Sequence, residues 1–278
     1  MSFSIYASCF NVKAMTFPWK ETLQNWVDFL GFEKNQLVIA VNRSEDDSPK
    51  LIREYLKEIV DPRSLLKVDV LDIDIPYTDP AFDGKGKAAA LAACTEPFCI
   101  LMDLDEAFPR GQRQHWTKLA TELERSNLDC FLLPVVDLCG DEQHYRDPIG
   151  SKFRLHKNNQ QFTRGVVKDA RRENGTFDTT KSDSTELIWK ETGELVRSAP
   201  ILMQGLPHFL TMAQIESGMV PFVFHLGWAS FEQRLKQSAF WRPVWQAREG
   251  NTVKTEETLE ELQKIPRFRH ALPPWRTT

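Results

Sequence analysis

Short apolar runs alternate with amphipathic segments through the first half of the chain. Residues 36–41 and 98–102 carry no charged side chain, and turn-forming or charged residues flank each run. Runs of this length that are apolar on both faces are typical of parallel strands in a sheet that helices cover on both sides. The sequence therefore predicts an α/β fold, in which ligands bind beyond the carboxyl ends of the strands.

The remaining periodic segments extend this pattern over residues 1–136. Apolar positions at helical or strand spacing predict the order strand 4–10, helix 16–30, strand 36–41, helix from 48, strand 65–75, helix 86–94, strand 97–102, helix 111–125 and strand 129–136. Residues 137–200 are polar and irregular; a strand is expected at 219–226, and helices from 230 and over 253–264. We expect one domain over 1–278, with a regular half at 1–136 and a variable half at 137–278.

Composition argues against several classes of protein. The 278 residues carry a net charge of -4, so bulk charge does not indicate a nucleic-acid or anionic-membrane partner. The five cysteines form no CxxC pair and no zinc-binding spacing, which favours buried free thiols in a reducing compartment. No basic leader precedes an apolar stretch, and no run of ~18 apolar residues occurs. We therefore expect a cytoplasmic protein without a transmembrane segment.

Three acids, Asp103, Asp105 and Glu106, end the apolar run 98–102 abruptly. In an extended strand exit, residues two apart point the same way, so Asp103 and Asp105 would converge on one spot. Two carboxylates there suit Mg²⁺ or Mn²⁺, which prefer oxygen ligands. A solvated strand end is the alternative, because D-x-D alone is a weak motif. The position directly after a buried strand favours the cation site.

Glycines and lysines alternate upstream of these acids in "FDGKGKAAALAAC". Gly84 and Gly86 flank Lys85, and Lys87 is expected to begin a helix. A helix N-terminus preceded by glycines can bind an anion, and lysine adds a positive charge. The spacing of a Walker A loop is absent. The alternative is a turn with two solvated lysines.

Two further segments carry side chains suited to catalysis. His225 follows a late apolar run and precedes Gly227-Trp228, so it is either a metal ligand or a structural histidine. Asp169 lies in a basic segment, either as an ion-pair partner or as a general base that its neighbours keep ionised. That segment combines Asp169 with basic residues that include Lys152, Arg154, Arg164, Lys168, Arg171 and Arg172.

In this order the segments resemble the family 2 glycosyltransferases of the GT-A fold, and most of all the bacterial subgroup that builds lipopolysaccharide core sugars and related glycans. The resemblance covers about residues 3–230, in "ASCFNVKAM", "VNRSEDDS", "DGKGKAAALAAC", "DLDE", "FRLHKNNQQFTRGVVKDA" and "HLGW". It implies a Rossmann-like, mainly parallel sheet flanked by helices. The nucleotide-sugar would bind the half at 1–136 and the acceptor the half at 137–278.

The resemblance also implies roles for the matched positions. Asp105 and His225 would bind a metal, and Asp103 would face the metal or the ribose. Asp169 matches the family's general base, but it is an aspartate where the family has a glutamate, and Lys168 replaces a histidine. The residues that would contact the nucleotide or its diphosphate are Asn11, Asn42, Ser44, Asp46, Lys85, Lys87 and Asp103. The family usually has an acid in place of Asn42.

The implied reaction moves a sugar from a nucleoside-diphosphate sugar, with a UDP-sugar as the expected donor, to a hydroxyl of a glycan or other acceptor. Mn²⁺ or Mg²⁺ would neutralise the leaving group, and direct displacement would invert the anomeric centre. The acceptor proton would go to Asp169 or to a nearby acid, namely Asp137, Asp141 or Glu142. Three aromatic residues, Trp228, Trp241 and Trp245, form either an acceptor platform or part of the core.

Three other functions remain open. A transferase that modifies a DNA base would use the basic segment to contact phosphates. A sugar-1-phosphate nucleotidyltransferase would need an early glycine-rich loop, and "ASCFNVKAM" contains no glycine. A degenerate GT-A module that only binds a nucleotide or a partner is the non-enzymatic alternative, which the departures at Asn42 and Lys168 keep open.

Overall fold

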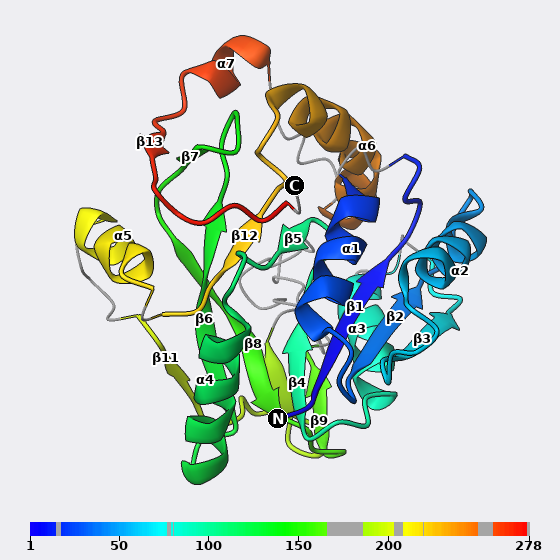
Figure 1. Cartoon of the computed structure of the whole chain (residues 1–278). Coiled ribbons are helices and arrows are strands. Elements are labelled where there is room, and N and C mark those ends of the chain that lie inside the picture. Colours follow the sequence, from blue (N-terminus) through cyan, green and yellow to red (C-terminus); the bar gives the residue numbers. More distant parts are fainter. Residues whose placement is uncertain are drawn as a thin grey trace.

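Strands and helices alternate from the N-terminus of the computed structural model, in the predicted order (Figure 1). The structure describes residues 1–14, 18–76, 79, 81–165, 186–202, 208–218, 220–249 and 258–276. The first elements are β1 (Phe3–Cys9), α1 (Trp19–Leu30), β2 (Gln36–Val41), α2 (Ser48–Ile59), β3 (Lys67–Asp72), α3 (Phe82–Ala92) and β4 (Phe98–Leu101).

The rest of the chain adds strands of both directions and four more described helices. Its elements are β5 (Glu106–Ala107), α4 (Arg113–Arg125), β6 (Cys130–Asp137), β7 (His144–Tyr145), β8 (Gly150–Lys157), β9 (Phe162–Arg164), β10 (Leu187–Trp189), β11 (Ser198–Pro200), α5 (His208–Glu216), β12 (Val223–His225), α6 (Phe231–Glu249), α7 (Leu259–Gln263) and β13 (Phe268–Arg269).

Most neighbours in the main sheet of the described chain are parallel. Its order is β3-β2-β1-β4-β8-β6-β12-β5, and β11 pairs with β6 off this path. The pairs β1–β2, β1–β4, β2–β3 and β6–β12 are parallel, whereas β8 runs antiparallel to both β4 and β6. The sheet therefore brings the carboxyl ends of β1, β2, β4, β6 and β12 to one edge.

Helices cover both faces of this sheet, because alternate residues of each strand are apolar on either side. Phe3, Ile5 and Ala7 of β1 join a buried cluster with α1, α2 and α4. Tyr6 of the same strand points the other way, into a cluster with α3 and the β9–β10 pair. A third cluster joins α5, β12 and the C-terminal segment.

This arrangement confirms the predicted α/β class, a mainly parallel sheet flanked by helices, consistent with a Rossmann-like GT-A fold. The prediction of an irregular segment over 137–200 was wrong, since β8 lies in the middle of the sheet. Within the described parts of the chain, no helix combines the length and apolar character needed to cross a membrane.

Helix α3 begins earlier than expected, so Gly86 has a packing role. The helix starts at Phe82, which places Gly84 and Lys85 inside its first turns rather than before it. A Cβ atom on Gly86 would lie 2.9 Å from the Cβ of Ser8 on β1. Glycine therefore allows α3 to approach the strand closely. The predicted anion site at a glycine-preceded helix N-terminus is not formed at Lys87.

We predict that Gly86→Ala destabilises the protein, whereas Gly150→Ala does not. Overpacking costs about 1–3 kcal/mol, and the helix propensity of alanine returns at most about 1 kcal/mol. The expected net loss in the free energy of unfolding is on the order of 1 kcal/mol, measured by urea titration. No atom lies within 4 Å of a Cβ on Gly150, which makes it the control. Equal stability of the two variants would contradict this packing role.

Candidate functional site

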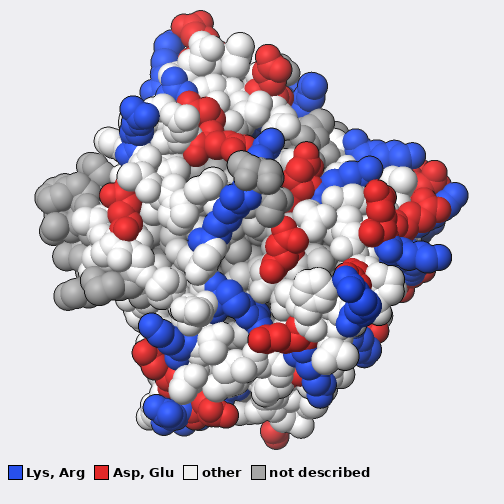
Figure 2. Space-filling model, viewed as in Figure 1, with Lys and Arg blue, Asp and Glu red and all other residues white. Residues whose placement is uncertain are grey.

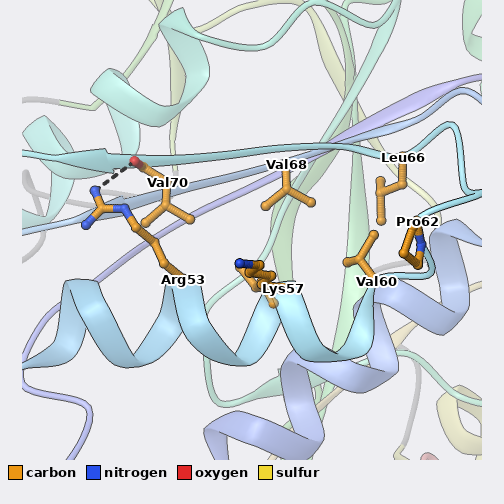
Figure 3. Close-up of a pocket in the computed structure, with 8 residues that line it drawn as sticks. Arg53, Lys57, Val60, Pro62, Leu66, Val68 and Val70 are labelled. Carbon is orange, nitrogen blue, oxygen red and sulfur yellow. Dashed lines mark hydrogen bonds between the residues drawn. The ribbon is translucent and has the colours of Figure 1, made fainter.

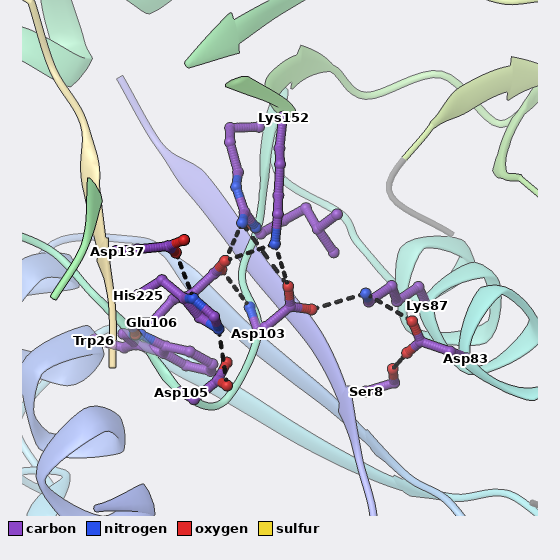
Figure 4. Close-up of polar contacts among 12 residues, drawn as sticks. Ser8, Trp26, Asp83, Lys87, Asp103, Asp105, Glu106, Asp137, Lys152 and His225 are labelled. Atoms are coloured by element: carbon purple, nitrogen blue, oxygen red, sulfur yellow. Dashed lines mark hydrogen bonds and ion pairs between the residues drawn. The ribbon is translucent and has the colours of Figure 1, made fainter. Parts of the chain in front are cut away.

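The acids after β4 occupy a tight turn and not an extended strand exit. The Met102 amide still donates to the Tyr6 carbonyl at 3.0 Å, but the Glu106 amide then donates back to the Asp103 carbonyl at 2.9 Å. The turn directs Asp103 and Asp105 to different partners (Figure 4). The expectation that their side chains converge through extended geometry was therefore wrong.

Asp103 lies among three positive charges. Its Oδ1 is 2.8 Å from the Lys87 ammonium, and its Oδ2 is 3.2 Å from Lys152 and 3.8 Å from Arg154. Burial alone would raise the pKa of Asp103, but Lys87, Lys152 and Arg154 lower it well below the usual range. The carboxylate is thus ionised and both of its oxygens have cationic partners.

Glu106 and Arg154 form a fully buried ion pair beside this cluster. Glu106 also accepts from the Asp103 amide at 2.8 Å and from Lys152 at 3.1 Å. Arg154 donates a second hydrogen bond to the Leu101 carbonyl at 2.8 Å. Buried charges need such partners, because desolvation costs several kcal/mol per ion. The pair therefore fixes the end of β4 against β8.

A second chain of contacts links Asp105, His225, Asp137 and Arg146. His225 Nε2 lies 3.1 Å from Asp105 Oδ2, and its Nδ1 lies 2.7 Å from Asp137 Oδ1. Arg146 Nε donates to the other oxygen of Asp137 at 2.8 Å. Burial would lower the pKa of His225, but Asp105 and Asp137 raise it to about 10. Burial would raise the pKa of Asp137, but His225 and Arg146 lower it to about 2.

The Asp105–His225 pair has the geometry of two neighbouring ligands of one divalent cation. Ligand atoms about 2.1 Å from an octahedral ion lie roughly 3 Å apart, close to the observed 3.1 Å. A Cβ on Gly227 would lie 3.0 Å from His225 Nε2 and 3.3 Å from Asp105 Oδ2, so glycine leaves space there. Asp137 holds the other ring nitrogen, as is usual for metal-binding histidines. The described residues contain no group of three or more His, Cys, Asp or Glu side chains suited to a metal.

The predicted nucleotide-contacting residues at the ends of β1 and β2 hold two loops together. The Asn11 amide donates to Ser44 Oγ at 3.0 Å, and Asn11 Oδ1 accepts from the Glu45 amide at 2.8 Å. Asp46 accepts from the Lys13 amide at 3.0 Å. Asn11 has a φ of 45°, in the left-handed region that asparagine tolerates. These side chains therefore shape the edge of the sheet.

Asn42 is oriented by two backbone donors. Its Oδ1 accepts from the Arg43 amide and from the Ile75 amide, each at 2.9 Å. The side-chain NH2 group is then the part of the amide that points elsewhere, and it can only donate. Asn42 would thus offer a ligand a hydrogen-bond donor where an acid would offer an acceptor.

The two lysines of the "GKGK" segment have different surroundings. Lys85 is half-exposed and pairs with Asp79 at 2.5 Å. Lys87 is 4% exposed and lies between Asp83 at 3.0 Å and Asp103 at 2.8 Å. Burial would lower the pKa of Lys87, but the two carboxylates raise it above its usual value. Lys87 therefore joins the cluster at Asp103, and Lys85 does not.

The predicted general base and acceptor platform lie partly outside the described residues. Asp169 lies outside the described residues, as do the side chains of Trp241 and Trp245. The Arg146 and Arg234 guanidinium carbons each lie 4.0 Å from the centroid of the Trp228 ring. The Trp228 ring therefore already stacks with cations, and its role as a sugar-stacking platform stays a prediction.

Sequence reasoning missed several residues of the site. Lys152, Arg154, Glu106 and Gly227 were not assigned roles there, although all four contact it or border it. The signal that could have identified Lys152 and Arg154 is their alternation with Phe153 and Leu155, which is a strand pattern with charged residues on one face.

Outside this site, the described surface carries mixed charges and an apolar groove. On the face shown in Figure 2, positive and negative side chains of the described residues are interspersed and form no broad basic patch. A groove of about 470 Å³ lies between α2 and the edge strand β3 (Figure 3). Its lining is mostly apolar, and its residues are Arg53, Leu56, Lys57, Val60, Pro62, Leu66, Val68 and Val70. The groove is therefore separate from the carboxylates at β4 and β12.

We predict that the His225 contacts make stability depend on pH in chelator-treated protein. The pKa of His225 is about 10 when folded, against about 6.5 when unfolded. The stabilisation is therefore complete below about pH 6.5 and is lost as pH rises toward about 10, by up to about 1.4 kcal/mol per pH unit. Urea unfolding of wild type and His225→Gln should converge over this window. A constant difference across it would exclude a protonated His225.

No protein-family model matches the chain, and no curated protein matches its sequence. Among solved structures, S. aureus TarS (1–349) aligns over 94% of this chain and 77% of its own, at 14% identity and a TM-score of 0.42. Mouse xyloside xylosyltransferase 1 aligns over 51% of this chain and 54% of its own, at 14% identity and a TM-score of 0.31. HddC from Yersinia pseudotuberculosis aligns over 56% and 72%, at 14% identity and a TM-score of 0.31. TarS has also been crystallised with UDP and with UDP-GlcNAc.

Proposed function

We propose that the protein is a metal-dependent glycosyltransferase that uses a nucleoside-diphosphate sugar. One observation carries the proposal. Asp105 and His225, 120 positions apart, meet at 3.1 Å at the carboxyl edge of a mainly parallel sheet, beside a cluster of lysines. That edge is where α/β sheets bind nucleotides. A cation site next to ammonium groups suits a diphosphate that leaves as an anion.

In this proposal Asp105 and His225 hold Mn²⁺ or Mg²⁺, and Asp137 keeps the His225 ring in position. When bound, the cation would neutralise charge on the departing diphosphate. Asp103 serves the cluster differently, because both of its oxygens already face Lys87 and Lys152. We assign it the role of holding the lysines in place; direct contact of Asp103 with the metal or ribose stays an untested prediction.

The base and ribose of the donor would lie against the loops after β1 and β2. Asn11, Ser44 and Asp46 fix the shape of those loops, and the Asn42 NH2 group would donate to the nucleotide. A UDP-sugar remains the proposed donor. Uracil has carbonyl oxygens that can accept a hydrogen bond from the Asn42 NH2 group. Other bases have such oxygens too, so the binding experiment decides which nucleotide is used.

The acceptor hydroxyl would lose its proton to an acid on the other half of the chain. Asp137 is a poor candidate, because one oxygen faces His225 and the other faces Arg146. Asp169 stays the proposed general base, with Asp141 or Glu142 in second place. Direct displacement by a glycan or other hydroxyl acceptor would invert the anomeric centre.

We predict that the protein is stabilised against heat by one nucleoside diphosphate, and more strongly with Mn²⁺. A thermal-shift screen of UDP, GDP, CMP and dTDP with and without Mn²⁺ measures this, because ligands that bind only the folded state raise the Tm. Asp105→Asn should remove the metal-dependent part of the shift, since an amide replaces a charged ligand. Asp72→Asn, on an exposed acid at the end of β3, is the control.

Absence of any nucleotide shift in wild type would refute the proposed function. A shift that Asp105→Asn leaves intact would place the cation elsewhere. A metal-dependent shift without hydrolysis or transfer from any tested sugar nucleotide would favour the binding-module alternative.

We also predict that Gly227→Ala weakens Mn²⁺ binding without unfolding the protein. Its new methyl group would lie within 3.3 Å of both Asp105 Oδ2 and His225 Nε2, where the cation would bind. The expected loss of Mn²⁺ affinity is at least about tenfold, which is about 1.4 kcal/mol. Electron paramagnetic resonance of free Mn²⁺ measures it directly. If Gly227→Ala binds Mn²⁺ as wild type does, the pair is not the metal site.

A further inference from the structure

Lys152 reaches the site from a strand that runs against its neighbours. The pairing of β4 with β8 ends at Ile100 opposite Leu155, and Lys152 lies three residues nearer the start of β8. Because β8 is antiparallel, its first residues lie beside the carboxyl end of β4. The Lys152 side chain therefore reaches Asp103 from a different direction than Lys87, which comes from α3 (Figure 4).

Lys152 is the most accessible cation of this cluster. Its side chain is 31% exposed, against 4% for Lys87 and none for Arg154. An ammonium group has three donors. Described residues take two of them, Asp103 Oδ2 at 3.2 Å and Glu106 Oε1 at 3.1 Å. One donor of Lys152 therefore remains for a ligand at the mouth of the site.

The carboxylates that contact Lys152 do not depend on it for neutralisation. Asp103 also pairs with Lys87, and Glu106 also pairs with the buried Arg154. Lys152 can thus share its charge with an incoming anion while both acids keep a cationic partner. Arg154 differs from Lys152, because removal of Arg154 would leave the buried Glu106 with only the partly exposed Lys152 as a cationic partner.

Lys152 is also near the proposed cation site. Its ammonium lies 3.1 Å from Glu106 Oε1, and Glu106 follows Asp105 directly and stands opposite His225 in the β5–β12 pair. An anion between a cation at Asp105–His225 and the Lys152 ammonium would therefore meet positive charge from both sides.

We propose that Lys152 binds the diphosphate group of the donor, in place of the role expected for Lys85. This inference rests on the proposed function and adds to it a binding residue from the second half of the chain. Lys87 acts through Asp103, as a positioning residue. The ligand chemistry is a diphosphate, which a nucleoside diphosphate and inorganic pyrophosphate share.

Isothermal titration calorimetry with inorganic pyrophosphate and with UDP, each with Mg²⁺, tests this. Lys152→Gln should weaken both ligands at least about tenfold, because one charged hydrogen bond is lost in each case. Lys152→Arg should recover most of the affinity. Lys157→Gln is the matched control, because Lys157 is a half-buried lysine at the far end of the same strand, bonded to the Ser126 carbonyl at 3.0 Å.

Four outcomes would overturn the proposal. Lys152→Gln could bind both ligands as wild type does, or Lys157→Gln could weaken them equally, which would indicate bulk charge. Loss of UDP binding with unchanged pyrophosphate binding would place Lys152 at the base or ribose. If wild type binds neither pyrophosphate nor any of the screened nucleotides, the proposed function fails with it.

A measurement on wild type covers the case in which Lys152 variants do not fold. Reductive methylation followed by mass spectrometry reports how accessible each lysine is. Pyrophosphate with Mg²⁺ should protect Lys152 several-fold and leave Lys157 unchanged. Equal labelling of Lys152 with and without pyrophosphate, under conditions in which calorimetry detects binding, would refute the contact.

Discussion

The buried ion pair between Glu106 and Arg154 determines the geometry of the whole site. Neither side chain reaches solvent, so the pair persists only because the surrounding groups supply hydrogen bonds. The Asp103 amide and the Leu101 carbonyl do so from the turn and from β4. The backbone carbonyl of Glu106 in turn accepts from Trp26 Nε1 of α1 at 2.8 Å. Because these contacts hold Glu106 in place, they also set the directions in which the neighbouring side chains of the turn point.

Much of the scaffold could be read from the sequence, because buried parallel strands leave a strong signal. The apolar run 36–41 has the bounds of β2 as observed, and residues 97–102 and 129–136 each match a strand within two residues. The family resemblance also predicted that Asp105 and His225 would lie together, and they do. Asp105 comes after β4 and His225 ends β12, and the mainly parallel sheet brings the carboxyl ends of these strands to one edge.

Strand β8 and the turn at 103–106 could not be predicted from the sequence, because polar residues occupy their buried positions. Strand β8 buries Arg154 and His156 on the face opposite Leu155, so one of its two buried faces is polar and the segment resembles a loop in sequence. The turn at 103–106 was equally hidden, since it depends on Glu106 finding a partner on β8. Start positions of helices were uncertain too, and for α3 that error moved Gly86 from an anion site to a packing contact.

Successive residues of the turn serve the two halves of the site. Asp105 faces His225, while Glu106 faces Arg154 and Lys152, and β5 pairs with β12 with Glu106 opposite His225. A cation at Asp105 and an anion at Lys152 would therefore both affect the position of this turn, the anion through the contact of Lys152 with Glu106. Linkage makes any such coupling reciprocal, so each ligand would change the affinity for the other by the same factor. The strength of this coupling would then be a property of the turn rather than of either ligand.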